Sequence, residues 1–189
     1  SMYRNEVSDL GAPVDSLNQP IFTGNVFGSG DFVAITDIGL PIASFYGFET
    51  AGIFQTDSEA AASAQSNAVA GDVIFVDQNE DGVINNEDKV VIGNPHPDFT
   101  YGFTAGATWK NLDFNLFLQG SYGNDVYMGM FRYDLNTTNL PVSALGRWTG
   151  EGTSNDIPRV THADLNQNNR VSDRFIEDGS YLRIKSLMV

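Results

Sequence analysis

The sequence predicts a mainly β protein built from antiparallel strands, with one short surface helix. Its composition favours strands, because 19 Gly, 7 Tyr and 13 Phe accompany Asn-rich stretches that separate short apolar runs. Residues 99–119 alternate between apolar and polar side chains over lengths typical of strands. Only residues 57–68 carry the signals of a helix.

Taken in order, the first part of the chain predicts short elements. Residues 1–38 are rich in Gly, Asn and Asp, and we expect a loop with one or two strands there. Aromatic runs broken by Gly and Pro at 39–48 and 52–55 predict short, sharply bent strands. The helix expected over 57–68 begins at a Thr-x-x-Glu capping box and has little apolar surface, so it should lie at the protein surface.

The alternation from 99 to 109 places Phe, Tyr, Phe, Ala, Ala and Trp on one face and Thr and Gly on the other. About ten residues is the length of a tilted membrane-spanning β-strand. Lys110 and Asn111 predict a two-residue turn, with Asn111 as the residue that tolerates positive φ. The following strand, from Leu112, alternates in the same way. A soluble sandwich strand would show this pattern too, so the pattern alone does not choose between membrane and soluble proteins.

Charge and composition exclude several function classes. The net charge is −14, from 24 acidic and 10 basic residues, which makes nucleic acid a poor partner. The absence of cysteine excludes disulfides, zinc–thiolate sites and a cysteine nucleophile. No apolar run approaches the roughly 20 residues of a membrane helix, and no signal peptide is visible at the first residues.

Residues 77–88 match the pattern D-x-N-x-D-G-x-I-x-x-x-D of an EF-hand-like calcium loop. Calcium takes six to eight oxygen ligands, and Gly82 permits the sharp turn that such a loop needs. Val83 would contribute its backbone carbonyl, and Asn85 would act through a water molecule. The predicted metal ligands are Asp77, Asn79, Asp81, Val83 and Asp88.

The residues around this loop indicate its role. Strand-like runs flank it in place of the helix pair of a calcium sensor, so we expect Ca²⁺ to act as a structural clasp. The alternative is an Asn/Asp-rich turn whose acids face water. Residues 164–172 echo the pattern, but they lack the Gly and carry Arg170, and Phe175 stands at the last ligand position. We therefore predict a polar turn there.

No enzymatic activity is expected. The two histidines, His96 and His162, lie far apart in the sequence, and His96 stands between Pro95 and Pro97, where a rigid turn is expected. Nucleophile-elbow, phosphate-loop and zinc-protease motifs are absent from the sequence. Neighbouring carboxylates such as Glu177 and Asp178 are expected by chance in so acidic a chain.

Longer strings resemble one known family. Residues 71–73, the loop 77–88 and residues 92–103 together resemble the signature GD(I/V)…D.NGDG.I…D…IGNP.P.F.YGF of SusC/RagA-type TonB-linked outer-membrane proteins. Residues 117–124 are similar to the family's FxQGSYGN segment. The resemblance covers residues 39–189, and further strings follow in family order at 41–47, 52–55, 147–149, 156–159 and 169–183. One departure is Glu80, where the family usually has Gly.

The resemblance implies that residues 1–189 are a partial TonB-dependent receptor β-barrel region, from a Gram-negative outer membrane of the Bacteroidetes type. Such barrels, of on the order of 22 strands, import oligosaccharides, peptides or other nutrients with a SusD-like surface lipoprotein and the TonB complex. The chain is too short to close a barrel and ends on a strand-like run, so we expect a fragment that self-associates when isolated. The residues expected to face lipid are Tyr101, Phe103, Trp109, Leu112, Phe114 and Leu116.

A rival interpretation keeps the calcium loop but not the membrane. It is a soluble, calcium-stabilised extracellular β-sandwich that binds glycan. It accounts for the acidic charge, the aromatic residues and the loop. It leaves the ordered family strings unexplained.

Overall fold

The structure is a computed structural model that describes residues 1–2, 4–11, 19–25, 31–129, 140–161 and 163–189. Every strand pairing in its four sheets is antiparallel, which confirms the predicted mainly β fold. The strands are β1 (Ile21–Asn25), β2 (Phe32–Thr36), β3 (Ser44–Phe48), β4 (Thr50–Ile53), β5 (Val73–Phe75), β6 (Lys89–Gly93), β7 (Phe99–Trp109), β8 (Leu112–Tyr122), β9 (Asp125–Tyr127), β10 (Ile176–Asp178) and β11 (Tyr181–Met188). The helical elements are α1 (Asp57–Ala61) and the 3₁₀ turns η1 (Asn86–Asp88), η2 (Val142–Gly146) and η3 (Asp173–Phe175).

Helix α1 is shorter than the predicted range 57–68. The capping box is present, because the Thr56 hydroxyl accepts from the Glu59 N–H at 3.3 Å while the Glu59 carboxylate accepts from the Thr56 N–H at 3.3 Å. The helix ends early because Gln65 is drawn into the protein. Its amide donates to the Val73 carbonyl at 2.9 Å and accepts from the Phe75 N–H at 2.7 Å. Tertiary hydrogen bonds thus override the helix propensity of the alanines.

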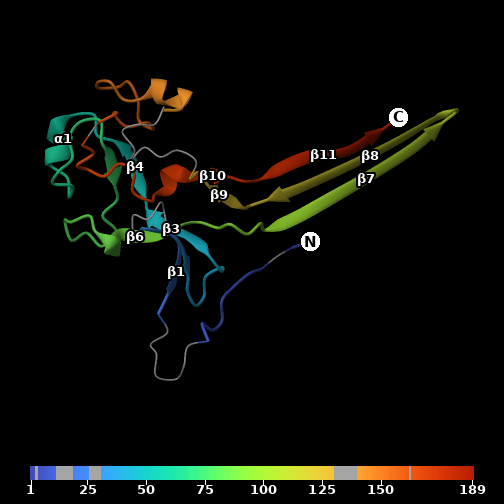
Figure 1. Cartoon of the computed structure of the whole chain (residues 1–189), viewed down its shortest axis with the longest axis horizontal. Helices are drawn as coiled ribbons and strands as arrows, with labels where there is room; N and C mark the ends of the chain where they lie inside the picture. The colour runs from blue at the N-terminus through green and yellow to red at the C-terminus, as the bar shows by residue number, and fades with distance from the viewer. Residues whose placement is uncertain (3, 12–18, 26–30, 130–139, 162) are drawn as a thin grey trace.

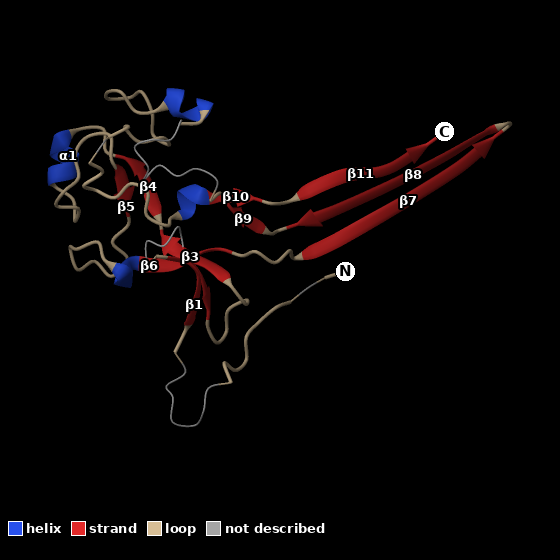
Figure 2. Cartoon of the chain, viewed as in Figure 1, coloured by secondary structure: helices blue, strands red, loops and turns tan. Residues whose placement is uncertain are grey.

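The longest strands form a separate three-stranded sheet in the order β11-β8-β7. Figures 1 and 2 show this sheet, here called the projecting sheet, extending away from the rest of the chain. β7 and β8 pair without interruption from Phe99↔Tyr122 to Trp109↔Leu112. In the turn between them, the positive φ of 53° falls on Lys110 rather than on Asn111 as predicted. The Lys110 ammonium lies 4.7 Å from the centre of the Trp109 ring, which helps to hold it there.

The register of the projecting sheet gathers apolar side chains on one face. Directly opposed pairs lie on the same face of an antiparallel sheet, and they alternate along each strand. Phe103 opposes Leu118, Ala105 opposes Leu116, and Trp109 opposes Leu112. All six residues predicted to share a face therefore do so. This apolar face consists of Phe99, Tyr101, Phe103, Ala105, Ala107, Trp109, Leu112, Phe114, Leu116, Leu118 and Tyr122, and it continues onto β11.

A β-bulge keeps β11 in line with the apolar face. The pairing passes from Ile184↔Leu118 to Ser186↔Phe117, so Lys185 is the extra residue. Leu187 then opposes Leu116 and lies on the same face as Ile184, although the two residues are an odd number of positions apart in the sequence. A regular strand would have placed them on opposite faces.

The described parts of residues 4–98 and 123–180 fold together at one end of the projecting sheet and are here called the loop module (Figure 1). It holds the sheets β1-β2-β3-β6, β4-β5 and β9-β10. β1 to β4 confirm the strands expected before residue 55, although residues 12–18 and 26–30 lie outside the described part. The hydrophobic core of the molecule lies in this module, where Ile84 packs against Phe48, Val73 and Phe75.

The first residues lie along the outer edge of β7, where Ser1 exchanges hydrogen bonds with Thr100 and Met2 bridges Phe99. Among the helices that the structure describes, none is long and apolar enough to cross a membrane.

Candidate metal centre

The predicted calcium loop connects β5 to β6. β5 ends two residues before Asp77, and the 3₁₀ turn η1 leads from Asp88 directly into β6 at Lys89. Strands therefore flank the loop, as predicted, and the structure shows that they belong to different sheets. An EF-hand helix pair is not present around residues 77–88.

Hydrogen bonds within the loop bring together the first three predicted ligands. The Asp77 carboxylate accepts from the N–H groups of Asp81 at 3.2 Å and Gly82 at 2.8 Å. The Asn79 side-chain oxygen accepts from the Asp81 N–H at 3.0 Å, and the Asn79 amide nitrogen lies 3.1 Å from Asp81 Oδ2. These bonds wrap the chain round Gly82, whose φ is +82°.

Asp88 joins the two ends of the loop. Its carboxylate is fully buried and accepts from the Gln78 N–H at 2.9 Å and the Asn85 N–H at 2.7 Å. Asn85 in turn caps η1 by accepting from the Glu87 N–H at 2.8 Å. The last predicted ligand is thus held in place by backbone donors from both ends of the turn.

The chemistry of the donor set fits a hard cation. All five predicted ligands offer oxygen, and a carboxylate oxygen that accepts one N–H still has a free lone pair. The described residues contain no group of three or more His, Cys, Asp or Glu side chains arranged to hold a metal. A cation here would rely on the Asn79 amide and the Val83 carbonyl as well as on carboxylates. Calcium binding stays a prediction.

Glu80 has an unusual backbone conformation. Its φ is +58°, in the left-handed region that glycine adopts freely. A side chain there costs roughly 1–2 kcal/mol. This conformation gives a physical reason for glycine at the corresponding position of the family pattern.

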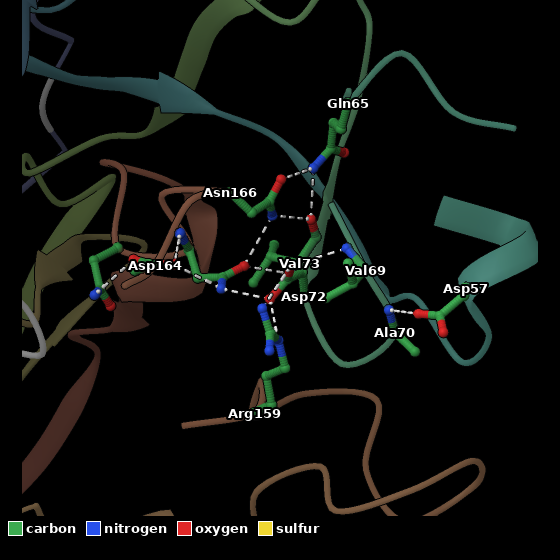
Figure 3. Close-up of polar contacts among 11 residues, drawn as sticks. Asp57, Gln65, Val69, Ala70, Asp72, Val73, Arg159, Asp164 and Asn166 are labelled. Atoms are coloured by element: carbon green, nitrogen blue, oxygen red, sulfur yellow. Dashed lines mark hydrogen bonds and ion pairs between the residues drawn. The ribbon is translucent and has the colours of Figure 1, made fainter. Parts of the chain in front are cut away.

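An ion pair with one buried member involves Asp72, directly before β5, the strand that leads into the loop, and sequence reasoning missed it. Asp72 is fully buried and accepts from Arg159 Nε at 2.7 Å and Nη2 at 3.3 Å (Figure 3). The Asn168 amide donates to the same carboxylate at 2.9 Å. Both members stand in strings that carried the family resemblance, but no local pattern marks an acid as buried. The pair holds together segments 87 residues apart in sequence.

The echo of the calcium loop at residues 164–172 is a polar turn, as predicted, but Asn166 and Asn168 within it are buried. Asp164 accepts from the Asn168 N–H at 2.9 Å, four residues on, as Asp77 does from Asp81. Asn166 and Asn168 then turn their amides towards the main chain of Val73, as Figure 3 shows for Asn166. Gln65 completes the network through a 2.8 Å bond to Asn166.

Arg170 covers the core beside these asparagines. Its guanidinium lies 5.2 Å from the ring centre of Phe48 and 5.3 Å from that of Phe75. Burial lowers the pKa of Arg170, and the charges of Asp31 and Asp164 oppose that shift. An arginine remains charged at neutral pH, so the contacts are cation–π contacts.

A cavity of about 660 Å³ is lined in part by Arg159 and its neighbours. Carboxylate, guanidinium, amide and apolar groups all line it, so its chemistry selects no single ligand class. Met128 and Leu140, which flank residues 130–139, are among the lining residues, and residues 130–139 lie outside the described part of the chain.

The described histidine has a structural role. His96 Nε2 lies 2.9 Å from the Ile42 carbonyl, and the His96 N–H donates to the Asn94 side chain at 3.0 Å. This arrangement agrees with the turn expected between Pro95 and Pro97. His162 lies outside the described residues.

The fold and the loop define a β-rich chain of antiparallel sheets whose longest strands expose an apolar face. No family model matches the sequence. The chain is 33% identical over 191 residues to TonB-dependent receptor P26 of Formosa agariphila. The aligned region covers 99% of this chain and 19% of that protein. It is 33% identical over 152 residues to TonB-dependent receptor P3 of the same organism, covering 79% of the chain and 15% of the relative.

A third relative is TonB-dependent receptor SusC of Bacteroides thetaiotaomicron, 32% identical over 115 residues, or 60% of this chain and 11% of SusC. The chain belongs to the TonB-dependent receptor family, and the resemblance to SusC-type proteins is confirmed. It spans about a fifth or less of the length of these curated relatives. All three are named receptors rather than enzymes.

Proposed function

We propose that the chain is part of the β-barrel of an outer-membrane transporter of a Gram-negative bacterium of the Bacteroidetes. The whole protein would import oligosaccharides or other nutrients, with the TonB complex and a SusD-like lipoprotein as partners. The observation that carries this proposal is the apolar face of the projecting sheet. An apolar face on three long adjacent strands requires an apolar environment.

The dimensions of that face support a membrane position. Trp109 lies eight residues after Tyr101 along β7. At about 3.4 Å per residue this separation is roughly 27 Å, close to the apolar band of about 25 Å in outer-membrane barrels. The two aromatic residues would then stand at the two membrane interfaces, where such residues gather.

The opposite face of the sheet has the chemistry of a barrel interior. It is polar apart from Phe117, Tyr181 and Met188, and it includes Thr100, Thr104, Thr108, Asp113, Asn115, Gln119 and Arg183. Short turns of outer-membrane barrels lie on the periplasmic side, and longer loops lie outside the cell. The Lys110–Asn111 turn would therefore face the periplasm, and the loop module would be extracellular.

Calcium is the second part of the proposal. The loop 77–88 would hold Ca²⁺ with Asp77, Asn79, Asp81, Val83 and Asp88, and the ion would brace the connection between β5 and β6. The support is the twelve-residue pattern, the oxygen-only donor set and the hydrogen bonds that already bend the loop round Gly82.

The rival soluble glycan-binding sandwich is disfavoured by the projecting sheet. A sandwich needs a second sheet packed on the apolar face of the first. Among the described residues no strand packs on that face, and all eight residues of β11 are exposed. We therefore retain the transporter proposal alone.

Spin labels test the membrane position. The chain has no cysteine. In the reconstituted full-length receptor, with any cysteine outside this chain replaced, one variant would carry a single cysteine at Leu116 and another at Asn115 for labelling. We expect the Leu116 label to collide with dissolved oxygen, which concentrates in lipid, and the Asn115 label to collide with a water-soluble nickel complex. Equal accessibility to both reagents at the two sites would refute the proposed lipid face.

A melting experiment tests the calcium loop separately. We expect the melting temperature of the loop module to rise with calcium and to fall with chelator. Asp77→Ala should abolish this difference because it removes a ligand, whereas Glu87→Ala should keep it, because Glu87 is an exposed acid of the same loop outside the ligand set. A calcium-dependent shift that survives Asp77→Ala would show that the ligand assignment is wrong.

A further inference from the structure

The calcium loop and residues 164–172 make contact through the strands on either side of the loop. We propose that residues 164–172 act as a clamp on the strands that enter and leave this loop, so that calcium binding and docking of the clamp stabilise each other. The inference rests on the calcium site proposed above. The clamp would link two long connections of the barrel. The connection before β7 contains the calcium loop, and the connection between β8 and β11 contains the clamp.

Side chains of the clamp are hydrogen-bonded to the main chain of β5, the strand that enters the loop. The Val73 N–H donates to the Asn168 side chain at 2.8 Å, and the Val73 carbonyl accepts from the Asn166 amide at 3.0 Å. β5 runs from Val73 to Phe75, and Asp77 follows two residues later. Because both backbone groups of Val73 are engaged, the approach to the first ligand is fixed.

The clamp holds the strand that leaves the loop through its neighbour β3. Phe48 pairs with Lys89, the first residue of β6 and the one that follows Asp88. On its other side the Phe48 N–H donates to the Val171 carbonyl at 2.9 Å, and Ser172 forms a parallel bridge with Phe48. The contact is close, since a Cβ added at Gly47 would lie 2.5 Å from the Val171 oxygen.

The core between these strands includes a residue of the loop itself. Ile84 packs against Phe48, Val73 and Phe75, and the Arg170 guanidinium lies over both phenylalanine rings. Ile84 is the apolar position of the calcium pattern, between the carbonyl ligand Val83 and Asn85. The clamp and the loop therefore share one small core.

A physical consequence follows from these contacts. Closing a flexible loop round an ion has an entropic cost, and the cost falls when the ends of the loop are already held. The clamp should therefore tighten calcium binding, and by linkage calcium must tighten docking of the clamp by the same factor. Coupling of this kind typically changes affinity by about 5- to 150-fold.

Calcium titration of the full-length receptor in detergent tests the proposal. We expect Arg170→Ala to weaken calcium binding about fivefold or more, with partial recovery in Arg170→Lys, which keeps the charge near the rings. Arg4→Ala, which removes an exposed arginine whose ion pair is with Glu6, should leave the dissociation constant unchanged. Loss of a positive charge alone would strengthen cation binding, so the direction of the change separates the clamp from simple electrostatics.

Hydrogen exchange provides the reciprocal measurement and does not depend on a variant that folds. Calcium should increase protection in residues 164–172 as well as in residues 77–88. If calcium binds but protects only the loop, and Arg170→Ala binds it as tightly as the parent, the clamp is refuted while the calcium site stands. If no calcium binds to the parent protein, the site and the clamp both fall.

Discussion

The loop module buries hydrophobic side chains in a core of its own, whereas the projecting sheet leaves its hydrophobic side chains exposed. In the loop module Phe48, Val73 and Phe75 form a core at 4% exposure or less. In the projecting sheet no hydrophobic residue of the three described strands is buried, and Phe103 and Trp109 are 58% and 67% exposed. One region supplies its own apolar environment, whereas the other needs one from outside.

Polar groups show the same contrast. The loop module buries the Asp72 carboxylate and several amides, all joined by hydrogen bonds, as buried polar groups must be. The projecting sheet satisfies its backbone by strand pairing and keeps its polar side chains on one face. Exposure of an apolar side chain therefore has a different meaning in the two regions. In the module it marks the boundary with water, and in the sheet it marks a surface that another phase or chain must cover.

The largest expected effect is on the isolated chain of 189 residues. Without detergent the apolar face and the free sheet edges should drive self-association, whereas detergent should keep the chain dispersed. Light scattering coupled to size-exclusion chromatography measures the mass in both conditions. A monodisperse monomer in detergent-free buffer would show that the sheet needs no cover, and the contrast between the regions would fail.

The next effect concerns the loop module alone. Asp72→Ala should destabilise it by about 3 kcal/mol, because the partly exposed Arg159 would lose its acceptor and the buried Asn168 amide would lose one of its acceptors. Denaturant unfolding in detergent, monitored by hydrogen exchange at β5, measures the loss of stability. Asp156→Ala removes an exposed acid from the same module and should change stability by no more than about 0.5 kcal/mol. Equal losses in the two variants would mean that the Asp72–Arg159 pair has no special role.

The smallest expected effect sharpens the description of the calcium loop. Glu80→Gly should stabilise the module by roughly 1 kcal/mol, because glycine adopts the positive φ at position 80 without strain. The matched change Glu87→Gly, in a turn with ordinary helical geometry, should be neutral or destabilising. Melting temperatures in chelator compare the two without calcium. A lower melting temperature for Glu80→Gly would contradict the strain at this position.

Several features could be predicted because they depend on neighbouring residues. The capping box at Thr56, the shared face of β7 and β8 and the turn round Gly82 follow from local spacing and backbone sterics. The length of α1 could not be predicted, because Gln65 leaves the helical path to bond to β5. Nor could the alignment of Leu187 with Ile184, since it depends on a bulge that only the pairing with β8 reveals.

The sequence by itself determined the β class, the apolar face of the hairpin, the family and the order of the oxygen donors in residues 77–88. The β class, the apolar face and the donor order rest on periods and spacings within about twenty residues, whereas the family rests on ordered strings spread over residues 39–189. Only the tertiary structure decided three contacts. Asp72 pairs with Arg159, Asn168 accepts a hydrogen bond from the Val73 N–H, and the Arg170 guanidinium lies over the Phe48 ring. The physical reason is the distance along the chain. These partners lie 87 to 122 residues apart, and only the folded backbone brings their hydrogen-bonding groups and rings within reach.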